Sequence, residues 1–129
     1  MKMLNIGLTV DGGASLTLPA RVGHARAFEM AFLGERIPAP RALDWGLINR
    51  VVPDDQLAPA VAELGAKLAA GPPGSYASIK RTINHRLYEG FEQVLDLEAV
   101  LQQERARSED FVEGVLAFMQ RRKAEFTGA

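Results

Sequence analysis

The tripeptide Asp-Gly-Gly stands out among the residues that could do chemistry. Asp11 is followed by Gly12 and Gly13, directly after an apolar run over residues 4–10. Glycine tolerates positive φ and close backbone approach, so the tripeptide predicts a sharp turn between two elements. A carboxylate at such a turn can transfer protons in a site, or it can cap the helix that follows. From the residues alone, capping is the better-supported role.

Other candidates for chemistry are sparse. The sequence has no cysteine, which excludes disulfides, thiolate nucleophiles and cysteine metal sites. His24 and His85 are far apart and show no ligand spacing, so surface or helix-packing roles are favoured over metal binding. Ser15, Ser75 and Ser108 lack the context of a nucleophile elbow, and Ser108 is better explained as a helix cap. We expect no metal site.

The composition is that of an ordinary globular protein. Its 129 residues fit one domain or part of one, with 47% hydrophobic and 24% charged residues. With 15 basic and 16 acidic residues, the net charge is −1, and no basic stripe runs along the chain. This balance argues against nucleic acid or an anionic membrane as the main partner. No apolar run approaches the ~20 residues that span a bilayer. We find no signal peptide and expect a cytoplasmic protein.

Helical periodicity dominates the sequence after Gly13. Apolar residues recur at spacings of three and four, most clearly within residues 57–68 and 91–101. Ser108 can cap the last helix, whose final turn is predicted to carry Arg121, Arg122 and Lys123, as the helix dipole favours. The pattern predicts about six helices: helical spacing runs over residues 25–32 and ends at Gly34, an apolar stripe marks residues 57–68, and further helices are predicted over residues 41–45, 75–88, 91–105 and after the cap Ser108.

The apolar run over residues 4–10 predicts one buried strand, and residues 47–52 predict a second, shorter extended piece. A lone strand without a partner cannot satisfy its backbone hydrogen bonds. A set of helices after an orphan strand therefore resembles the tail of a larger α/β protein.

Three stretches resemble the enoyl-CoA hydratase/isomerase, or crotonase, family, and they keep the family's order and spacing over nearly the whole chain. They are Ile-Gly-Leu-Thr-Val-Asp-Gly-Gly-Ala-Ser at 6–15, the run from Gly-Glu-Arg-Ile at 34–37 to Ala-Leu-Asp-Trp-Gly-Leu-Ile-Asn-Arg-Val-Val-Pro at 42–53, and Ser-Glu-Asp-Phe-Val-Glu-Gly at 108–114 with its continuation to residue 128.

The resemblance implies an α/β crotonase-like fold, truncated to its C-terminal half. This chain would be mostly α-helical with one or two short strands. Residues 1–53 would be a remnant of the family's spiral core, and residues 54–129 its C-terminal helical trimerisation region.

The resemblance also implies what this half lacks. In the family the N-terminal half supplies the backbone N–H groups of the oxyanion hole and one catalytic acid. The hydratases' second glutamate corresponds to Met3 or Leu4 here. We therefore expect no appreciable catalysis by this chain alone.

Family chemistry runs through the enolate of a CoA thioester, which backbone N–H groups stabilise. Asp11 matches the loop position at which an aspartate moves the proton in isomerase-like members, including those resembling ring-epoxide phenylacetyl-CoA isomerases. Gly12 and Gly13 would bind substrate beside it. Arg122 and Lys123 could meet the CoA phosphates, although a solvated cationic helix end is the simpler interpretation. The resemblance implies no separate cofactor, because CoA is part of the substrate.

Two kinds of function remain open from the sequence. The chain could belong to an enzyme that acts on the double bond of an acyl-CoA thioester in fatty acid or phenylacetate metabolism, with a separate N-terminal half as a possible partner. Alternatively, it could be an inert fragment or a helical assembly module. In either case the resemblance implies a homo-oligomer, a trimer or a hexamer, and exposed apolar faces would cause association or poor solubility.

Overall fold

The N-terminal segment forms a turn of helix where a strand was predicted. The computed structural model describes residues 3–129, and its first element is a 3-10 helix, η1 (Leu4–Ile6). The N–H of Ile6 donates to the Met3 carbonyl at 3.1 Å, and that of Gly7 donates to the Leu4 carbonyl at 3.0 Å. The prediction of a strand over residues 4–10 is therefore wrong for its first half, because these N–H groups bond locally.

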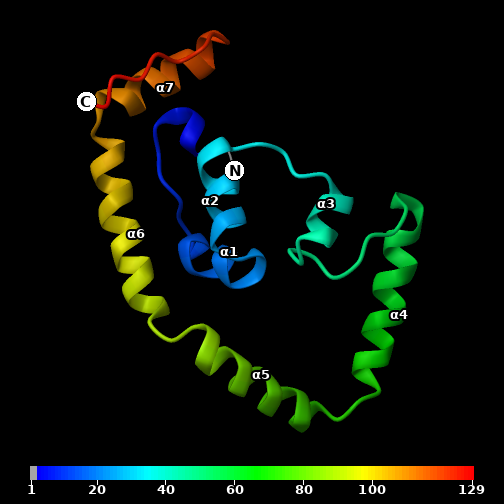
Figure 1. Ribbon diagram of the computed structural model, residues 1–129. Coiled ribbons are helices and arrows are strands. Elements are labelled where there is room, and N and C mark those ends of the chain that lie inside the picture. The colour runs from blue at the N-terminus through cyan, green and yellow to red at the C-terminus, as the bar shows by residue number, and fades with distance from the viewer. Residues whose placement is uncertain (1–2) are drawn as a thin grey trace. The chain divides into compact units, whose positions relative to one another are not determined.

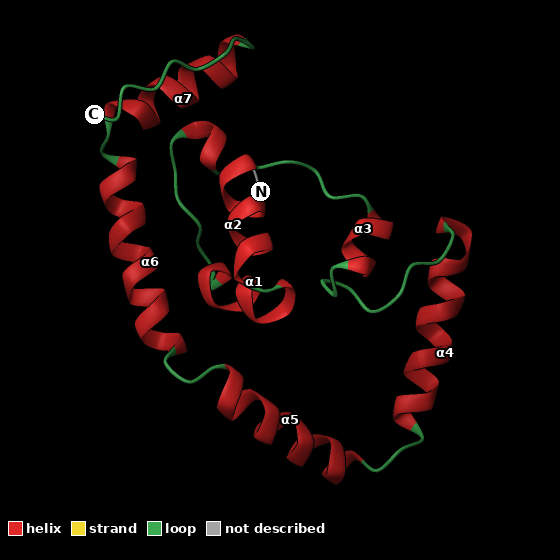
Figure 2. Cartoon of the chain, in the orientation of Figure 1, coloured by secondary structure: helices red, strands yellow, loops and turns green. Residues whose placement is uncertain are grey.

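The second half of that run, residues 8–10, lies outside any helix but joins no sheet. The N–H of Thr9 donates instead to Gln102 Oε1 at 3.0 Å, so a side chain takes the place of a neighbouring strand. The extended piece predicted over residues 47–52 forms no strand either, and none occurs in residues 3–129 (Figure 2).

Helices build the described chain, as predicted (Figure 1). Their ends follow the sequence signals, since Gly34 stops the second helix with φ 60° and Pro73 begins the fifth. The α-helices are α1 (Ala14–Val22), α2 (His24–Leu33), α3 (Ala39–Asp44), α4 (Leu57–Ala69), α5 (Pro73–Leu87), α6 (Phe91–Ala106) and α7 (Glu109–Gln120), with a further 3-10 helix, η2 (Asp54–Gln56), before α4.

The chain divides into two units. The first consists of Met1–Ile37 with Gly90–Ala129 and holds η1, α1, α2, α6 and α7; the second is Pro38–Glu89 with α3 to α5. In the first unit α1 packs on α2 and α6, while α7 packs on α6 and η1. The Asp-Gly-Gly loop thus lies in the unit that joins the two ends of the sequence. The predicted division of the chain into a spiral-core remnant, residues 1–53, and a trimerisation region, residues 54–129, stays a prediction.

Two glycines let η1 approach α7 backbone to backbone. A Cβ on Gly114, within α7, would lie 2.6 Å from Ile6 Cα, and a Cβ on Gly7 would lie 2.9 Å from the Asp110 carbonyl carbon. No side chain fits between these segments, so glycine is required on both sides of the contact.

Large apolar side chains are mostly exposed. Among the described residues the buried apolar side chains are small, namely Val22, Ala27, Ala42 and Ala117, and no large side chain is fully buried. The predicted stripe on α4 forms but stays open, with Val61 61% exposed. Such uncovered apolar faces favour association with another surface.

The last helix begins as predicted and ends earlier. The N–H of Phe111 donates to Ser108 Oγ at 3.1 Å, which confirms the cap. However, α7 ends at Gln120, and the prediction of a basic last turn is wrong. Arg121 takes left-handed geometry with φ 55°, and the N–H of Arg122 turns back to the Ala117 carbonyl, so the chain leaves the helix there.

Candidate functional site

The Asp-Gly-Gly turn forms as predicted. Gly12 and Gly13 have φ values of 64° and 78°, and the N–H of Ala14 donates to the Asp11 carbonyl at 3.1 Å. Asp11 and Gly12 are exposed, whereas Gly13 is buried. A side chain on Gly13 would collide with the ring of Phe91 at the start of α6, so this glycine also permits the loop to lie close to α6.

The acceptor at the N-terminus of α1 comes from α6. Glu98, only 4% exposed, accepts from the Gly13 N–H at 2.7 Å through Oε2. Its Oε1 accepts from the Ser15 N–H at 3.0 Å and the Ser15 hydroxyl at 2.5 Å. No side-chain cap comes from the N-cap residue Gly13 itself. The capping role favoured for Asp11 from the residues alone is therefore wrong, because Glu98 occupies those N–H donors.

The buried carboxylate of Glu98 remains charged in this environment. Burial raises its pKa, but the hydrogen bonds from Ser15 and Gly13 outweigh burial and hold the pKa below its ordinary value of 4.5. A negative charge at the start of α1 also complements the helix dipole.

Gln102 lies one helical turn after Glu98 and contacts the other side of the loop. Its Oε1 accepts from the Thr9 N–H, and its Nε2 donates to Asp11 Oδ2 at 3.3 Å. The exposed Asp11 carboxylate is thus not used for capping, and an amide from α6 orients it. Such a carboxylate can accept or deliver a proton to a group beside the loop.

A cavity of about 730 Å³ adjoins the loop within the first unit. Val10, Ala14 and Ser15 line it next to the loop, whereas Asp11, Gly12 and Gly13 do not. Apolar side chains dominate the remaining wall, including Leu8, Leu18, Phe28, Phe32, Leu33 and Phe126. The cavity therefore suits an apolar group more than a charged one.

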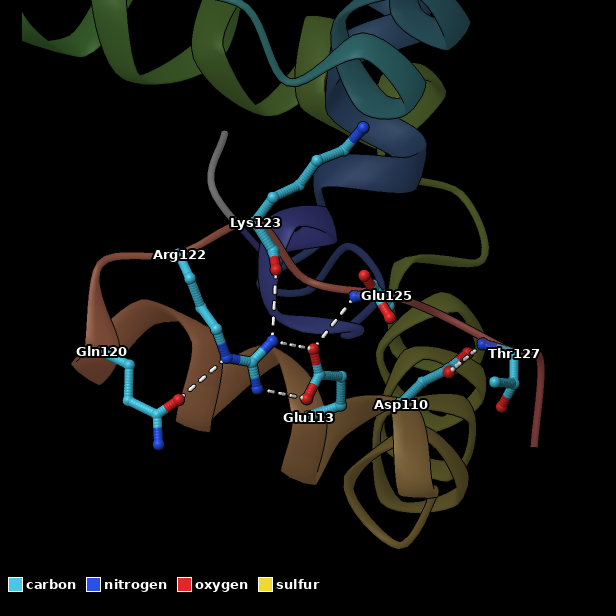
Figure 3. A network of polar contacts seen from close by, with 7 residues as sticks. All are labelled: Asp110, Glu113, Gln120, Arg122, Lys123, Glu125 and Thr127. Atoms are coloured by element: carbon cyan, nitrogen blue, oxygen red, sulfur yellow. Dashed lines mark hydrogen bonds and ion pairs between the residues drawn. The ribbon is translucent and has the colours of Figure 1, made fainter.

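The C-terminal tail carries the predicted phosphate-binding residues. Arg122 forms a two-pronged ion pair with Glu113, with distances of 2.5 Å and 2.6 Å, and its Nε donates to Gln120 (Figure 3). The side chain of Lys123 points away from this network in Figure 3. Arg122 is therefore committed to Glu113, and a phosphate would have to compete for it. The structure does not bring Arg122 and Lys123 together with Asp11 in one set of contacts, and their phosphate role stays a prediction.

The same tail folds back on α7 through acidic side chains. Asp110 accepts from the N–H of Thr127 at 2.7 Å, and Glu113 accepts from the Glu125 N–H (Figure 3). Asp110 also accepts from the N–H of Gly128 at 3.0 Å. The hydrogen bonds from Arg122 are the main reason that the pKa of Glu113 lies at about 2. The tail is thus fastened to the helix that packs on η1.

Glu98, Gln102 and Glu113 are not among the site residues predicted from the sequence. One signal was present for Glu98, since it lies four residues after Val94 and three before Leu101, on the apolar stripe of α6. A charge on an apolar stripe indicates a buried partner. No comparable signal marks the other two, whose partners depend on the tertiary fold.

Within residues 3–129 the chain has neither a cluster of metal-binding side chains nor a helix that could span a membrane. No group of three or more His, Cys, Asp or Glu side chains is placed to hold a metal ion. The ring of His24 contacts that of Phe28, with the centroids 4.6 Å apart and the ring planes tilted by 43°. No helix among the described residues is both long and apolar enough to cross a bilayer.

Comparison with known proteins gives consistent results. The family model described as "Enoyl-CoA hydratase/isomerase" matches residues 1–129. The chain is 38% identical over 128 residues to a 1,2-epoxyphenylacetyl-CoA isomerase of Escherichia coli K12, covering 99% of this chain and 49% of that protein. It is 42% identical to a probable enoyl-CoA hydratase of Rhodobacter capsulatus, covering 95% of this chain and 48% of that protein.

The fold of the chain is also similar to that of a solved structure. The crystal structure of an enoyl-CoA hydratase from Mycobacterium avium subsp. paratuberculosis superposes with a TM-score of 0.94 at 42% identity, covering 98% of this chain and 52% of that one. The chain spans about half the length of the curated relatives it matches, as expected of a C-terminal fragment. With its full length matched by the family model, the chain belongs to the enoyl-CoA hydratase/isomerase family.

Proposed function

We propose that this chain is the C-terminal part of an enzyme that acts on the double bond of an acyl-CoA thioester. In this proposal the reaction passes through an enolate held by N–H groups outside this chain, and Asp11 moves the proton. CoA enters as part of the substrate, with no separate cofactor. The cavity beside the loop would accept an apolar part of the acyl group.

The observation that carries the proposal is the exposure of the Asp11 carboxylate and its hydrogen bonding. It is exposed, and it caps no helix because Glu98 takes the N–H groups of α1. The carboxylate accepts a hydrogen bond from the neutral amide of Gln102, which can orient a carboxylate without neutralising it. A 1,2-epoxyphenylacetyl-CoA isomerase and a trans-2-decenoyl-[acyl-carrier-protein] isomerase are among the relatives, and so is a probable enoyl-CoA hydratase, so the choice of proton transfer rests on the Asp11 carboxylate.

A second candidate, a helical assembly module without activity, has its own supporting observation. Apolar side chains on α4 and α6 are exposed, for example Leu57 at 58% and Leu97 at 58%. A module of this kind would associate through these faces and would not need the Asp11 carboxylate.

Reconstitution separates the two candidates. The chain is co-expressed with the N-terminal half of the Escherichia coli relative, and the purified complex is assayed for isomerisation of enoyl-CoA thioesters. Asp11→Asn keeps the turn and removes the titratable group, so turnover should fall by roughly 10²–10⁴-fold. An active complex whose Asn variant turns over at the wild-type rate would refute the proton role. Association without any turnover would favour the assembly module.

A further inference from the structure

Residues 9–15, which form the Asp11 loop and the first two residues of α1, are held by two side chains of one helix, and the proton-transfer proposal gives these two side chains no step in the reaction. Glu98 and Gln102 are four residues apart on α6 and lie on the same face of the helix. Together they accept from the N–H groups of Thr9, Gly13 and Ser15 and donate to Asp11. In the sequence, Asp11 lies between Thr9, which Gln102 holds, and Gly13, which Glu98 holds.

We infer that Glu98 and Gln102 are positioning residues that hold the Asp11 loop in the orientation its proton transfer needs. This inference rests on the proposed function, because Asp11 must be the group that they position. Glu98 fastens the end of the loop where α1 begins, and Gln102 fastens both the start of the loop and the carboxylate itself. Neither residue is assigned contact with the substrate.

The hydrogen-bonding groups of Glu98 and Gln102 match the donors and acceptors that they contact. Glu98 accepts through both oxygens, one for Gly13 and one for Ser15. Glutamine at this position would offer one acceptor and an NH₂ group, so a donor would face a donor on one side. Gln102 has to accept from Thr9 and donate to Asp11 at once, which an amide does and a methionine of similar shape does not.

Matched controls exist on the same helix. Gln103 is exposed and adjacent to Gln102, and Glu104 is exposed and lies on α6 beyond Glu98. Gln103→Met and Glu104→Gln therefore repeat each chemical change away from the loop. If positioning is the function of Glu98 and Gln102, the controls should behave as wild type in every assay.

The first test needs no catalysis and uses the chain as it is. Amide hydrogen exchange of Gly13 and Ser15 is followed by NMR in the wild type, Glu98→Gln and Glu104→Gln. Loss of the acceptor should speed exchange at Gly13 or Ser15 by at least about tenfold, with the control unchanged. Equal protection in Glu98→Gln would overturn the inference. If Glu98→Gln does not fold, as judged by circular dichroism, Glu98→Asp keeps the charge but shortens the side chain by one methylene, and it should likewise speed exchange at Gly13 or Ser15.

The second test uses the reconstituted enzyme and a double-mutant cycle. Gln102→Met should lower kcat by about 10²-fold with KM little changed, because misplacement of a reacting group by about 1 Å has an effect of that size. In the Asp11→Asn background, Gln102→Met should have no further effect on kcat. If Gln102 had a purely structural role, Gln102→Met would lower kcat by the same factor in the wild type and in Asp11→Asn. Additive losses would overturn the positioning role.

The two proposals fail in different ways. If Asp11→Asn leaves turnover intact, the proton-transfer proposal fails, while the exchange data still show whether Glu98 holds the loop. If Asp11→Asn is inactive but Gln102→Met keeps full kcat, the proton-transfer proposal stands and the positioning role of Gln102 is wrong.

Discussion

At the residue scale, the Asp11 loop depends on an acceptor that arrives 85 positions later in the sequence. Side-chain acceptors at a helix start are worth about 1 kcal/mol, and a buried carboxylate that accepts several hydrogen bonds is costly to remove. Glu98 therefore links loop and helix in a way that a local cap could not, since it also fixes the distance between α1 and α6.

The pairing of Glu113 with Arg122 predicts how the tail responds to acid. The pKa of Glu113 is lowered to about 2 from 4.5, so the ionised form is favoured in the folded tail. Its contribution to tail docking is full above about pH 4.5 and is lost as the pH falls through about 2. The side-chain carboxyl carbon resonance of Glu113 should titrate with a midpoint near 2.

Replacement of Arg122, the ion-pair partner of Glu113, is the control for that titration. Arg122→Gln removes the largest cause of the shift, so the midpoint should rise toward 4.5. A midpoint near 4.5 in the wild type as well would show that the ion pair does not form in solution.

Arg121 holds an unfavourable backbone conformation at the end of α7. Its φ of 55° costs a side-chain-bearing residue about 1–2 kcal/mol, which glycine avoids. Arg121→Gly should therefore raise the free energy of unfolding by about 0.5–1 kcal/mol after the entropy of the unfolded chain is counted. Gln120→Gly, still inside the helix, should lower it by about 1 kcal/mol. Urea denaturation measures the free energy of unfolding of each variant. Equal changes in Arg121→Gly and Gln120→Gly would refute the left-handed cap at Arg121.

At the element scale, close packing of η1 on α7 makes Gly114 sensitive to any side chain. A Cβ there would meet Ile6 Cα at 2.6 Å and the Ile6 carbonyl carbon at 2.7 Å, both of them backbone atoms. Gly114→Ala should destabilise by about 1–3 kcal/mol despite the better helix propensity of alanine. Thermal unfolding of the variant gives the measurement.

Gly65 provides the comparison. It lies within α4, and a Cβ there would meet nothing within 4 Å, so Gly65→Ala should stabilise by about 1 kcal/mol. If Gly114→Ala stabilises the chain as much as Gly65→Ala does, the backbone contact of η1 with α7 is absent in solution.

Helices could be predicted from the sequence because their signals are local. Periodicity and end residues mark α5 and α6 to within about two residues of the observed bounds, and Ser108 marks the start of α7. The strand could not be decided this way, because a short apolar run is ambiguous and its form depends on a partner. The turn at Gly12 was predictable, whereas Glu98 and Gln102 act through contacts distant in sequence.

At the scale of the whole molecule, the exposed stripe of α4 predicts association. Leu57, Val61 and Leu68 are each more than half exposed on one face. Burial of such side chains is worth about 1.5–3 kcal/mol each, so the chain should form oligomers in sedimentation at micromolar concentration.

One charged substitution tests which face is responsible. Val61→Lys should shift the equilibrium toward the monomer, whereas Ala66→Lys, on the opposite face of α4, should leave it unchanged. Sedimentation of a stable wild-type monomer at high concentration would contradict this expectation.

The central claim is that Asp11 moves a proton on a substrate carbon, and solvent isotope exchange measures that step directly. The reconstituted enzyme is incubated with an enoyl-CoA thioester in D₂O, and NMR follows deuterium incorporation next to the double bond. We predict incorporation by the wild type that is slowed by roughly 10²–10⁴-fold in Asp11→Asn. Incorporation at the wild-type rate by the Asn variant would contradict the account.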